Sequence, residues 1–435
     1  MSTWILLGLV LAVGLPYIAW TRIEARKHSR AAVVHEEVVA LGDEVVPVSI
    51  HPEIDLDACI GSGACVRACP EDGVLAITDG RARLVSPMSC IGHSACLAAC
   101  PVGAIRLVFG TATRGIELPK LSSSFETTAA GIYVVGELGG MGLIRNAVEQ
   151  GRQAAAAIVK SGRRGGAGDL DAIVVGAGPA GIATALALAA QGLRYLVVEQ
   201  DKFGGTITHY PRAKVVMTGS LELPGYGTVR RSTMSKEDLV ELWTDIRART
   251  DLPVREGVRV TTIEREGAAW RVQGDGFRDR AATVVLALGR RGAPRELGVP
   301  GEELAKVVYR VIEPEVFAGR RVLVVGGGNA AADCVIALAE QGQCASVGIS
   351  YRRSELARVR ASVRARLDDL IAAGRVTSHL ESEVVSIAAD QVLLRTPRGL
   401  EQVPNDHVVV QIGGTAPSEL LRSIGIELVE KRGEA

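Results

Sequence analysis

The sequence predicts an α/β chain with two doubly wound parallel-sheet domains, a small α+β domain and an N-terminal transmembrane helix. Three observations predict this fold class. Two segments each contain a hydrophobic strand, a glycine motif and an alanine-rich helix; six of the eight cysteines lie between Cys59 and Cys100; and residues 2–21 carry no charge. At 435 residues the chain exceeds the roughly 100–200 residues of one ordinary domain, so we expect several.

The composition excludes a partner attracted by net charge. Lysine plus arginine and aspartate plus glutamate both number 49, so no overall field draws the chain to nucleic acid, and no nucleic-acid partner is expected. The 50 glycines and 4% aromatic residues are typical of α/β domains with many tight turns. Clustered cysteine spacings indicate cofactor ligands rather than disulfides, and hence a reducing cytosol.

Residues 1–22 are predicted to be a transmembrane anchor. The uncharged run WILLGLVLAVGLPYIAW has aromatic residues at its ends and is followed by Arg22, Arg26 and Lys27, an arrangement that favours a cytoplasmic location for the rest of the chain. We therefore expect a single-pass protein of the inner membrane with catalytic domains in the cytoplasm, the membrane being one partner. A buried helix and a cleaved signal peptide are the alternatives.

Two nearly identical cysteine motifs indicate a bound redox cofactor. The first reads CIGSGACVRACP from Cys59, and the second reads CIGHSACLAACP from Cys90. Both resemble the C-x2-C-x2-C-x3-C-P run of bacterial two-cluster ferredoxins, in which the last cysteine of each run binds the other cluster. The resemblance implies two iron–sulfur clusters. By this resemblance, the ligands would be Cys59, Cys65 and Cys100 for one cluster, and Cys90, Cys96 and Cys69 for the other.

The motifs depart from that family at the second ligand position, where Ser62 and His93 replace cysteine. Three thiolates support either a 3Fe-4S cluster or a 4Fe-4S cluster whose fourth iron binds Ser62, His93 or solvent. Zinc binding and the loss of any metal are the alternatives.

A dinucleotide-binding fingerprint follows a hydrophobic strand that begins at Asp171. Glycines at the strand-to-helix turn let the backbone approach a pyrophosphate, and an acidic residue after the next strand accepts from ribose hydroxyls. The fingerprint residues are Gly176, Gly178, Gly181 and Glu199.

A second fingerprint begins at Arg321, with Gly326, Gly328 and Ala331 at the corresponding positions. The strand after it ends in arginines rather than an acid. Arg352, Arg353 and Arg358 suit a 2′-phosphate, so NADPH is favoured over NADH. The alternative is that these arginines form a solvated helix start.

The two fingerprints together resemble flavoproteins of the thioredoxin reductase type, with FAD in the first Rossmann-like domain and NAD(P)H in the second. In that family a closing strand and helix lie at the C-terminus, whereas here their likeness, FETTAAGIYVVGELGGMGL, begins at Phe125. The chain thus resembles a circular permutation of the family. Glu137 stands where the family has aspartate, which implies contact with the flavin's ribityl or phosphate chain.

The second half lacks the C-x-x-C pair of thioredoxin reductases, since its cysteines are Cys334 and Cys344 alone. Cys334 is expected to pack in a helix. The stretch from Gly204 to Tyr226 resembles the bacillithiol disulfide reductases, which implies that residues near the flavin include Gly204, Gly205 and Thr206. His209 is either a neighbour of the substrate or a structural histidine.

These inferences together predict a membrane-anchored NAD(P)H-dependent FAD and iron–sulfur oxidoreductase with an unknown electron donor or acceptor. The alternatives are a thioredoxin reductase-like or low-molecular-weight disulfide reductase, and an electron-transfer subunit of a larger membrane complex. No catalytic residue is assigned, and the oligomeric state is open between monomer and homodimer. The expected boundaries are 1–22 anchor, 23–52 linker, 53–112 ferredoxin-like domain, 113–160 permuted segment, 161–170 linker, 171–295 FAD domain, 296–400 NAD(P)H domain and 401–435 return to the FAD domain.

Overall fold

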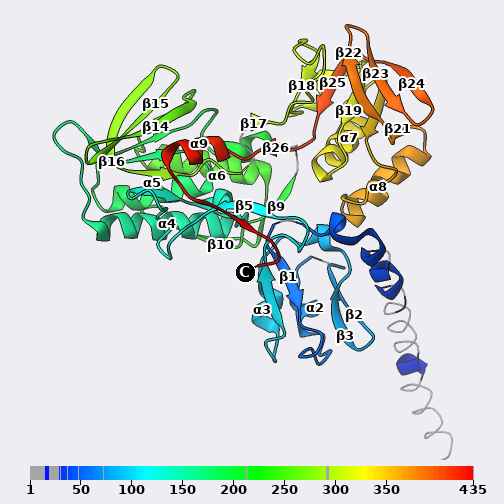
Figure 1. Ribbon diagram of the computed structural model, residues 1–435, viewed down its shortest axis with the longest axis horizontal. Helices are drawn as coiled ribbons and strands as arrows, with labels where there is room; N and C mark the ends of the chain where they lie inside the picture. Colours follow the sequence, from blue (N-terminus) through cyan, green and yellow to red (C-terminus); the bar gives the residue numbers. More distant parts are fainter. Residues whose placement is uncertain are drawn as a thin grey trace, which may run out of the picture. The chain divides into compact units, whose positions relative to one another are not determined.

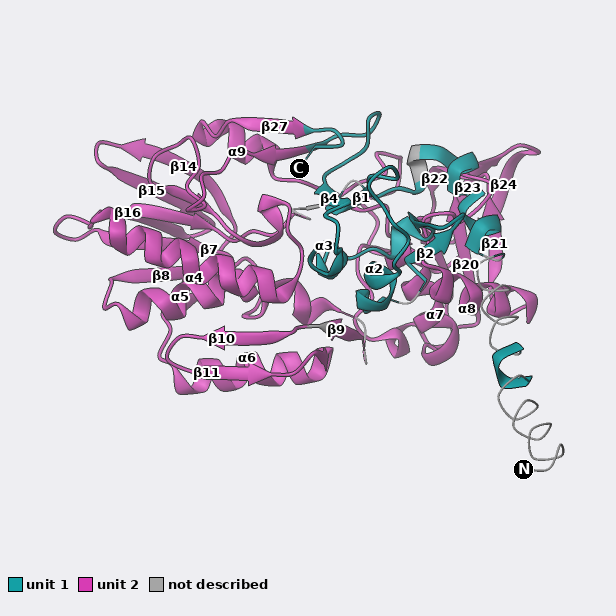
Figure 2. Ribbon diagram, turned by 90° about the horizontal axis from the view of Figure 1, so that it is seen from below, with its two compact units in different colours: residues 1–116, 431–435 teal, residues 117–430 magenta. Residues whose placement is uncertain are grey.

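The chain divides into two compact units in the computed structural model (Figure 2). The small unit comprises residues 1–116 and 431–435, and the large unit comprises residues 117–430. The structure describes residues 15–18, 29, 31–36, 38–47, 49–71, 73–210, 212, 214–290 and 293–434.

The small unit folds around the two cysteine motifs as an internal repeat. Strand β1 (His51–Ile54) pairs antiparallel with β4 (Ile105–Val108), and β2 (Leu75–Thr78) pairs antiparallel with β3 (Arg81–Leu84). Each motif begins one short helix, α2 (Ala64–Ala68) or α3 (Ala95–Ala99). The cysteines share their core with aliphatic residues of the strands. The remaining elements are the 3₁₀ helices η1 (Gly42–Val45) and η2 (Pro87–Ser89).

The first sheet of the large unit has the order β13-β8-β7-β16-β15-β14, and β6 also pairs with β16. Its central strands are parallel, and apolar clusters cover both faces, as expected of a doubly wound domain. The strands are β6 (Ile132–Val134), β7 (Leu170–Val175), β8 (Tyr195–Val198), β13 (Val254–Arg255), β14 (Val260–Glu266), β15 (Ala269–Gly274) and β16 (Phe277–Leu286).

The segment upstream of the first fingerprint belongs to this same sheet. Strand β6 is parallel to β16, with Ile132 opposite Val284. After it, helix α4 (Ile144–Ser161) lies beside α5 (Pro179–Ala190) in Figure 1. The two helices approach closely at Gly151, where a Cβ would lie 2.4 Å from the carbonyl oxygen of Ala180.

The second sheet of the large unit has the order β18-β25-β19-β20-β21, and all its strand pairs are parallel. Helices α7 and α8 pack beside each other on this sheet (Figure 1). The elements are β18 (Val307–Val308), β19 (Arg321–Val325), α7 (Asn329–Gln341), β20 (Ser346–Tyr351), α8 (Ala361–Ala372), β21 (Thr377–Leu380) and β25 (His407–Val410).

Smaller elements complete the large unit. Helix α6 (Lys236–Arg249) begins with a capping box in which Ser235 and Asp238 exchange side-chain and backbone hydrogen bonds, a strong helix-start signal. The small sheets are β22 (Glu383–Ile387), β23 (Gln391–Thr396) and β24 (Gly399–Pro404); β9 (Val215–Met217) with β12 (Thr233–Ser235); β10 (Ser220–Leu223) with β11 (Gly227–Arg230); β17 (Ala293–Pro294) with β26 (Gly414–Thr415); and β5 (Ile116–Pro119) with β27 (Leu428–Lys431). The short helices are η3 (Gly136–Gly139), η4 (Gly205–His209), η5 (Pro314–Phe317) and α9 (Ser418–Ile424).

The expected fold class needs one correction, which concerns the predicted transmembrane helix. Within the described ranges, no helix has both the length and the apolar character needed to cross a membrane. Of residues 1–22 only the helical residues 15–18 are described, and the rest of the predicted anchor lies outside the described residues. The inner-membrane location, which depended on this helix, is wrong with it, and the expected membrane partner loses its basis.

Candidate cofactor-binding sites

The first glycine loop is closed on one side and open on the other. Gly176 has φ of +107°, and a Cβ there would lie 2.5 Å from the carbonyl oxygen of Ala287 at the end of β16. A Cβ on Gly181 would lie 1.9 Å from the carbonyl oxygen of Gly176, whereas one on Gly178 would meet nothing within 4 Å. The loop therefore forms a cradle at the start of α5 that a pyrophosphate can approach.

Glu199 follows β8 and is held against this loop. Its side chain is 5% exposed, and its two carboxylate oxygens accept from the backbone N–H groups of Ala177 at 2.6 Å and Asp201 at 2.9 Å. Burial raises the pKa of Glu199, and the two N–H donors oppose that rise. A carboxylate has further lone pairs, so Glu199 can still accept from ribose hydroxyls.

The structure brings the stretch from Gly204 to Thr206 to the same loop. The N–H of Gly204 donates to the carbonyl oxygen of Ala177 at 2.9 Å. A Cβ on Gly205 would lie 3.1 Å from the Cα of Gly178, and Thr206 beside it is exposed. These three residues can therefore border a ligand bound to the first loop.

The upstream segment also reaches this site. Gly136, with φ of +78°, donates its N–H to the side chain of Gln150 at 2.8 Å, and a Cβ on it would lie 3.1 Å from that of Ala180 in α5. Glu137 follows and is exposed. Burial lowers the pKa of the nearby Arg290, and the charge of Glu137 opposes that shift. Glu137 thus lies next to the helix start that the first glycine loop forms.

The second glycine loop repeats the construction of the first. Gly326 has φ of +149°, and a Cβ there would lie 2.3 Å from the carbonyl oxygen of Gln411, just after β25. Ala331 is fully buried against Gly326, and a Cβ on Gly328 would meet nothing within 4 Å. This loop too is packed against the end of the neighbouring strand and open toward a phosphate.

The end of β20 supplies the wall beside the second loop. The ring of Tyr351 packs on Gly327, where a Cβ would lie 2.2 Å from the ring carbons. Arg352 follows and is exposed, whereas Arg353 is half-buried. Both predicted arginines therefore follow directly on a residue that packs against the loop, but their exposure differs.

Two further arginines carry buried, unsatisfied donors. The Nε atoms of Arg358 and Arg360 are buried without a hydrogen-bond partner among the described residues. The backbone N–H of Arg360 donates to the side-chain oxygen of Asn329 at 2.8 Å, which ties this segment to the first turn of α7. Buried guanidinium donors need an acceptor, and a phosphate supplies one of the right charge.

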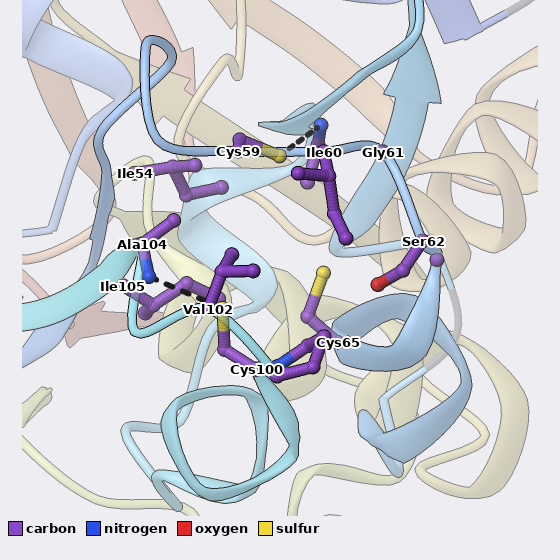
Figure 3. Close-up of a pocket in the computed structure, with 13 residues that line it drawn as sticks. Ile54, Cys59, Ile60, Gly61, Ser62, Cys65, Cys100, Val102, Ala104 and Ile105 are labelled. Carbon is purple, nitrogen blue, oxygen red and sulfur yellow. Dashed lines mark hydrogen bonds between the residues drawn. The ribbon is translucent and has the colours of Figure 1, made fainter.

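The first thiol group surrounds a pocket in the small unit (Figure 3). Cys59, Cys65 and Cys100 line it together with Ser62, and its empty volume, open solvent included, is about 290 Å³. The sulfur of Cys59 accepts from the N–H of Ala82 at 3.4 Å, and the sulfur of Cys100 accepts from the N–H of Ala104 at 3.2 Å. Hydrogen bonds of this kind to the sulfurs are typical of iron–sulfur sites.

The second thiol group combines Cys90 and Cys96 with Cys69 of the first motif. Burial raises the pKa of the Cys96 thiol to about 11, and the charges of Cys90 and Cys69 add to that rise. In the first group, burial likewise raises the pKa of the Cys65 thiol, and the charges of Cys59 and Cys100 add to that rise. The cysteines therefore group crosswise between the motifs, as the ferredoxin resemblance implies. Within the described residues, no three acidic, histidine or cysteine side chains are placed to hold a single metal ion.

Several residues that complete these sites escaped the sequence analysis. Tyr351 and Arg360 border the second loop, while Gln150 and Arg290 border the first. A signal existed for Gln150, a polar residue on the apolar face of a predicted helix. Arg360 lies two residues beyond Arg358, so the basic run after β20 was a signal that we used only in part.

The two remaining candidates, Cys334 and His209, have contacts within the fold that account for their positions. Cys334 is buried in the core beneath α7, and burial raises its thiol pKa to about 12. His209 lies at the end of η4, where its Nε2 pairs with the carboxylate of Asp201 at 3.2 Å; that carboxylate also accepts from Arg310 at 3.2 Å. Burial lowers the pKa of His209, with Arg310 adding to the shift.

Comparison with protein families matches both units. Residues 173–434 match the model described as pyridine nucleotide-disulphide oxidoreductase, and residues 51–101 match the model of the 4Fe-4S dicluster domain. The cysteine motifs and the glycine loops lie inside these matches. The residues present fit the implied groups because each glycine loop is an open cradle, the thiols of Cys59, Cys65 and Cys100 line one pocket, and Cys69 and Cys90 are close enough to raise the pKa of Cys96.

Individual relatives resemble more than half of the chain. A ferredoxin–NADP reductase of Ignicoccus hospitalis is 32% identical over 272 residues, 59% of this chain and 82% of the relative. A bacilliredoxin reductase of Bacillus subtilis is 25% identical, covering 60% of this chain and 82% of the relative. A solved bacillithiol disulfide reductase of Bacillus cereus shares the fold, with a TM-score of 0.53 and 24% identity over 60% of this chain and 82% of its own.

Proposed function

Because the chain belongs to the pyridine nucleotide-disulphide oxidoreductase family and also carries a 4Fe-4S dicluster domain, we propose that its iron–sulfur clusters are the electron partner of its own flavin. The chain is an FAD-dependent NAD(P)H oxidoreductase that uses FAD, NAD(P)H and iron–sulfur clusters. The direction of electron flow, the preference for NADPH and the external partner belong to the proposal.

One observation carries this proposal: the cluster motifs share a polypeptide with a flavoprotein that lacks the C-x-x-C pair of thioredoxin reductases. The large unit has only Cys334 and Cys344, and the thiol of Cys334 is buried with a raised pKa. The similar protein of Ignicoccus hospitalis is named a ferredoxin–NADP reductase. A chain that carries its own ferredoxin-like motifs can use them in the place of that separate partner.

The protein's residues bind and position the cofactors. When bound, FAD supplies the conversion between the two-electron chemistry of NADPH and the one-electron chemistry of the clusters. We assign Gly176, Gly178 and Glu199 to FAD, and Gly328 with the arginines after β20 to NADPH, whose 2′-phosphate would meet the unsatisfied donors.

The order of segments in the large unit supports a permuted flavoprotein. Residues 113–160 contain β6, which pairs with β16, and all but the last residue of α4, which packs on α5, although both elements precede the first fingerprint. We propose that this segment closes the FAD site from upstream. The proposal accounts for the position of Glu137 beside the start of α5.

The test uses the full chain, reconstituted with iron and sulfide and kept free of oxygen. Addition of NADPH should bleach the flavin absorption and then produce the paramagnetic signal of reduced clusters. A matched variant, Cys65→Ala with Cys96→Ala, should keep NADPH-dependent reduction of an artificial dye while losing the cluster signal. Clusters that stay oxidised while the flavin of the unmodified chain is fully reduced would refute the proposal.

A disulfide reductase is the second candidate, and it rests on the likeness to bacilliredoxin and bacillithiol disulfide reductases. The His209–Asp201 pair at the end of η4 lies where the sequence places the flavin's neighbourhood. Consumption of NADPH on addition of a low-molecular-weight disulfide, abolished in His209→Ala, would favour this candidate. Equal consumption with and without the disulfide would exclude it.

A further inference from the structure

The two cysteine motifs lack a thiol at the same position, and the replacing side chains occupy equivalent places. The hydroxyl oxygen of Ser62 accepts from the backbone N–H of Ala64 at 3.4 Å. In the second motif, Nδ1 of His93 accepts from the N–H of Ala95 at 3.3 Å. Each side chain therefore accepts a hydrogen bond from the backbone N–H two residues further on. Each also stands at the position where the ferredoxin motif has its second cysteine.

The backbone around Ser62 fixes where its hydroxyl lies. Gly61 has φ of +69°, and a Cβ there would lie 2.1 Å from the carbonyl oxygen of Gly80, so this turn cannot shift toward β2 and β3. Arg67 holds the other side by donating to the carbonyl oxygen of Ser62 at 3.3 Å. Figure 3 shows the Ser62 hydroxyl directed into the pocket, toward the sulfur of Cys65.

The second motif has the same backbone conformation, but other residues surround it. Gly92 has φ of +72°, and a Cβ there would lie 2.3 Å from the side chain of Ile50. Ser94 has φ of +65° although it is not glycine, so the turn keeps the left-handed conformation of its counterpart Gly63. The position of His93 is therefore imposed by the loop as firmly as that of Ser62.

The number of lone pairs distinguishes the two side chains. A hydroxyl oxygen has two acceptor lone pairs, so Ser62 can accept from Ala64 and still bind iron. An imidazole nitrogen has one, and the N–H of Ala95 occupies the one on Nδ1 of His93. In the neutral ring the other nitrogen, Nε2, then carries the proton and cannot bind a metal.

We propose that the two clusters differ at their fourth iron: Ser62 binds it in the cluster of Cys59, Cys65 and Cys100, whereas His93 does not bind it in the cluster of Cys69, Cys90 and Cys96. That second iron takes water or a small thiolate instead, thiolate being the ligand that such iron prefers. The inference deepens the proposed function, because it makes one cluster fully protein-bound and the other open to a small ligand.

The test counts three-iron clusters after mild oxidation of the full chain. Ferricyanide takes one electron from a four-iron cluster, and an iron that the protein does not hold leaves as Fe²⁺, so three irons and four sulfides remain. This product is paramagnetic when oxidised. Wild-type protein should give about one equivalent of the three-iron signal per chain, from the open cluster alone.

Three variants separate the two positions. Ser62→Ala should double the signal, whereas His93→Ala should leave it unchanged, because His93 holds no iron. His93→Cys should abolish it by closing the open cluster. Addition of 2-mercaptoethanol should shift the spectrum of the reduced wild-type protein and leave that of His93→Cys unchanged.

Contrary outcomes are equally specific. A signal that rises in His93→Ala would show that His93 is a ligand, and a signal unchanged in Ser62→Ala would show that Ser62 is not one. If Ser62→Ala lost the whole cluster, Ser62→Cys decides: recovery of the wild-type iron content supports ligation, and failure to recover refutes it. No step uses NADPH, so a chain whose clusters NADPH does not reduce would fail the proposed function without affecting this result.

Discussion

Gly178 and Gly328 allow a substitution that separates cofactor binding from folding. Their backbone angles, φ −77° with ψ −176° and φ −110° with ψ 179°, are open to any residue, and a Cβ at either meets nothing within 4 Å. Because an alanine fits without strain and restricts the unfolded chain, we expect Gly178→Ala to leave the stability of the FAD-free protein unchanged or to raise it by about 0.4–1 kcal/mol.

The same methyl group points to the open side of the loop, where the pyrophosphate of FAD would approach. Overpacking of this kind costs about 1–3 kcal/mol, and 1.4 kcal/mol is a tenfold change in a dissociation constant. We therefore expect Gly178→Ala to weaken FAD binding roughly 5- to 150-fold. Gly328→Ala should weaken the binding of NADP by a comparable factor and leave the affinity for FAD unchanged.

Titration of the FAD-free protein with FAD, followed by flavin fluorescence, measures the change in FAD affinity. Unfolding in urea, followed by the fluorescence of the buried Trp243 and Trp270, measures the change in stability. If Gly178→Ala bound FAD as tightly as the unmodified protein, or lost more than about 2 kcal/mol of stability, the geometry of this loop would be refuted.

Three further predictions concern the large unit. Gly181→Ala should lower its free energy of unfolding by at least about 1–3 kcal/mol, seen in urea denaturation, because the new methyl would lie 1.9 Å from the Gly176 oxygen; unaltered stability would contradict this. Arg352→Gln should reduce kcat/KM for NADPH about 10- to 150-fold, the worth of a charged hydrogen bond, and spare NADH; equal losses would exclude a 2′-phosphate contact. Burial works to raise the pKa of Asp171, but donors from Arg194 outweigh it and lower that pKa, so its stabilisation is present above the unfolded-state pKa and lost as pH falls through the folded one. Asp171→Asn should therefore reduce stability at pH 7 and weaken the acid dependence of unfolding, and an unchanged dependence would contradict the assignment.

The cofactor loops could be predicted from the sequence because their requirements are local. A strand, closely spaced glycines and a helix lie within one short segment, and the chemistry depends on backbone space at Gly176 and Gly326. The cysteine motifs are equally local. Their crosswise grouping is not, and it was available only through resemblance to ferredoxins.

Features that depend on tertiary packing could not be predicted in the same way. Strand β6 has three residues (Ile132–Val134), too few for a periodicity to identify it, and only family likeness pointed to its place. Tyr351 borders the second loop because of the glycine opposite it. The predicted anchor rested on hydropathy along residues 2–21, and the described residues contain no helix that is long and apolar enough for a membrane span.

Spacing alone could not distinguish Ser62 from His93 as substitutes for cysteine. Both stand at the same place in the motif, and both were therefore equal candidates. The proposed difference arises because the N–H of Ala95 occupies the one lone pair on Nδ1 of His93, whereas the hydroxyl oxygen of Ser62 keeps a second lone pair after accepting from Ala64. Such a detail requires coordinates, because the sequence contains no information on which lone pair is in use.

The path of the chain between the two units makes the large unit an insertion within the small one. The chain leaves the small unit at residue 116 and returns at 431, where Gly433 and Glu434 pair with Phe109. Two covalent crossings therefore tether flavin and clusters, and one proteolytic cut cannot release either partner. Short tethers maintain effective concentrations of about millimolar. Electron exchange between the two halves should then be first order in the chain, and dilution should not slow it.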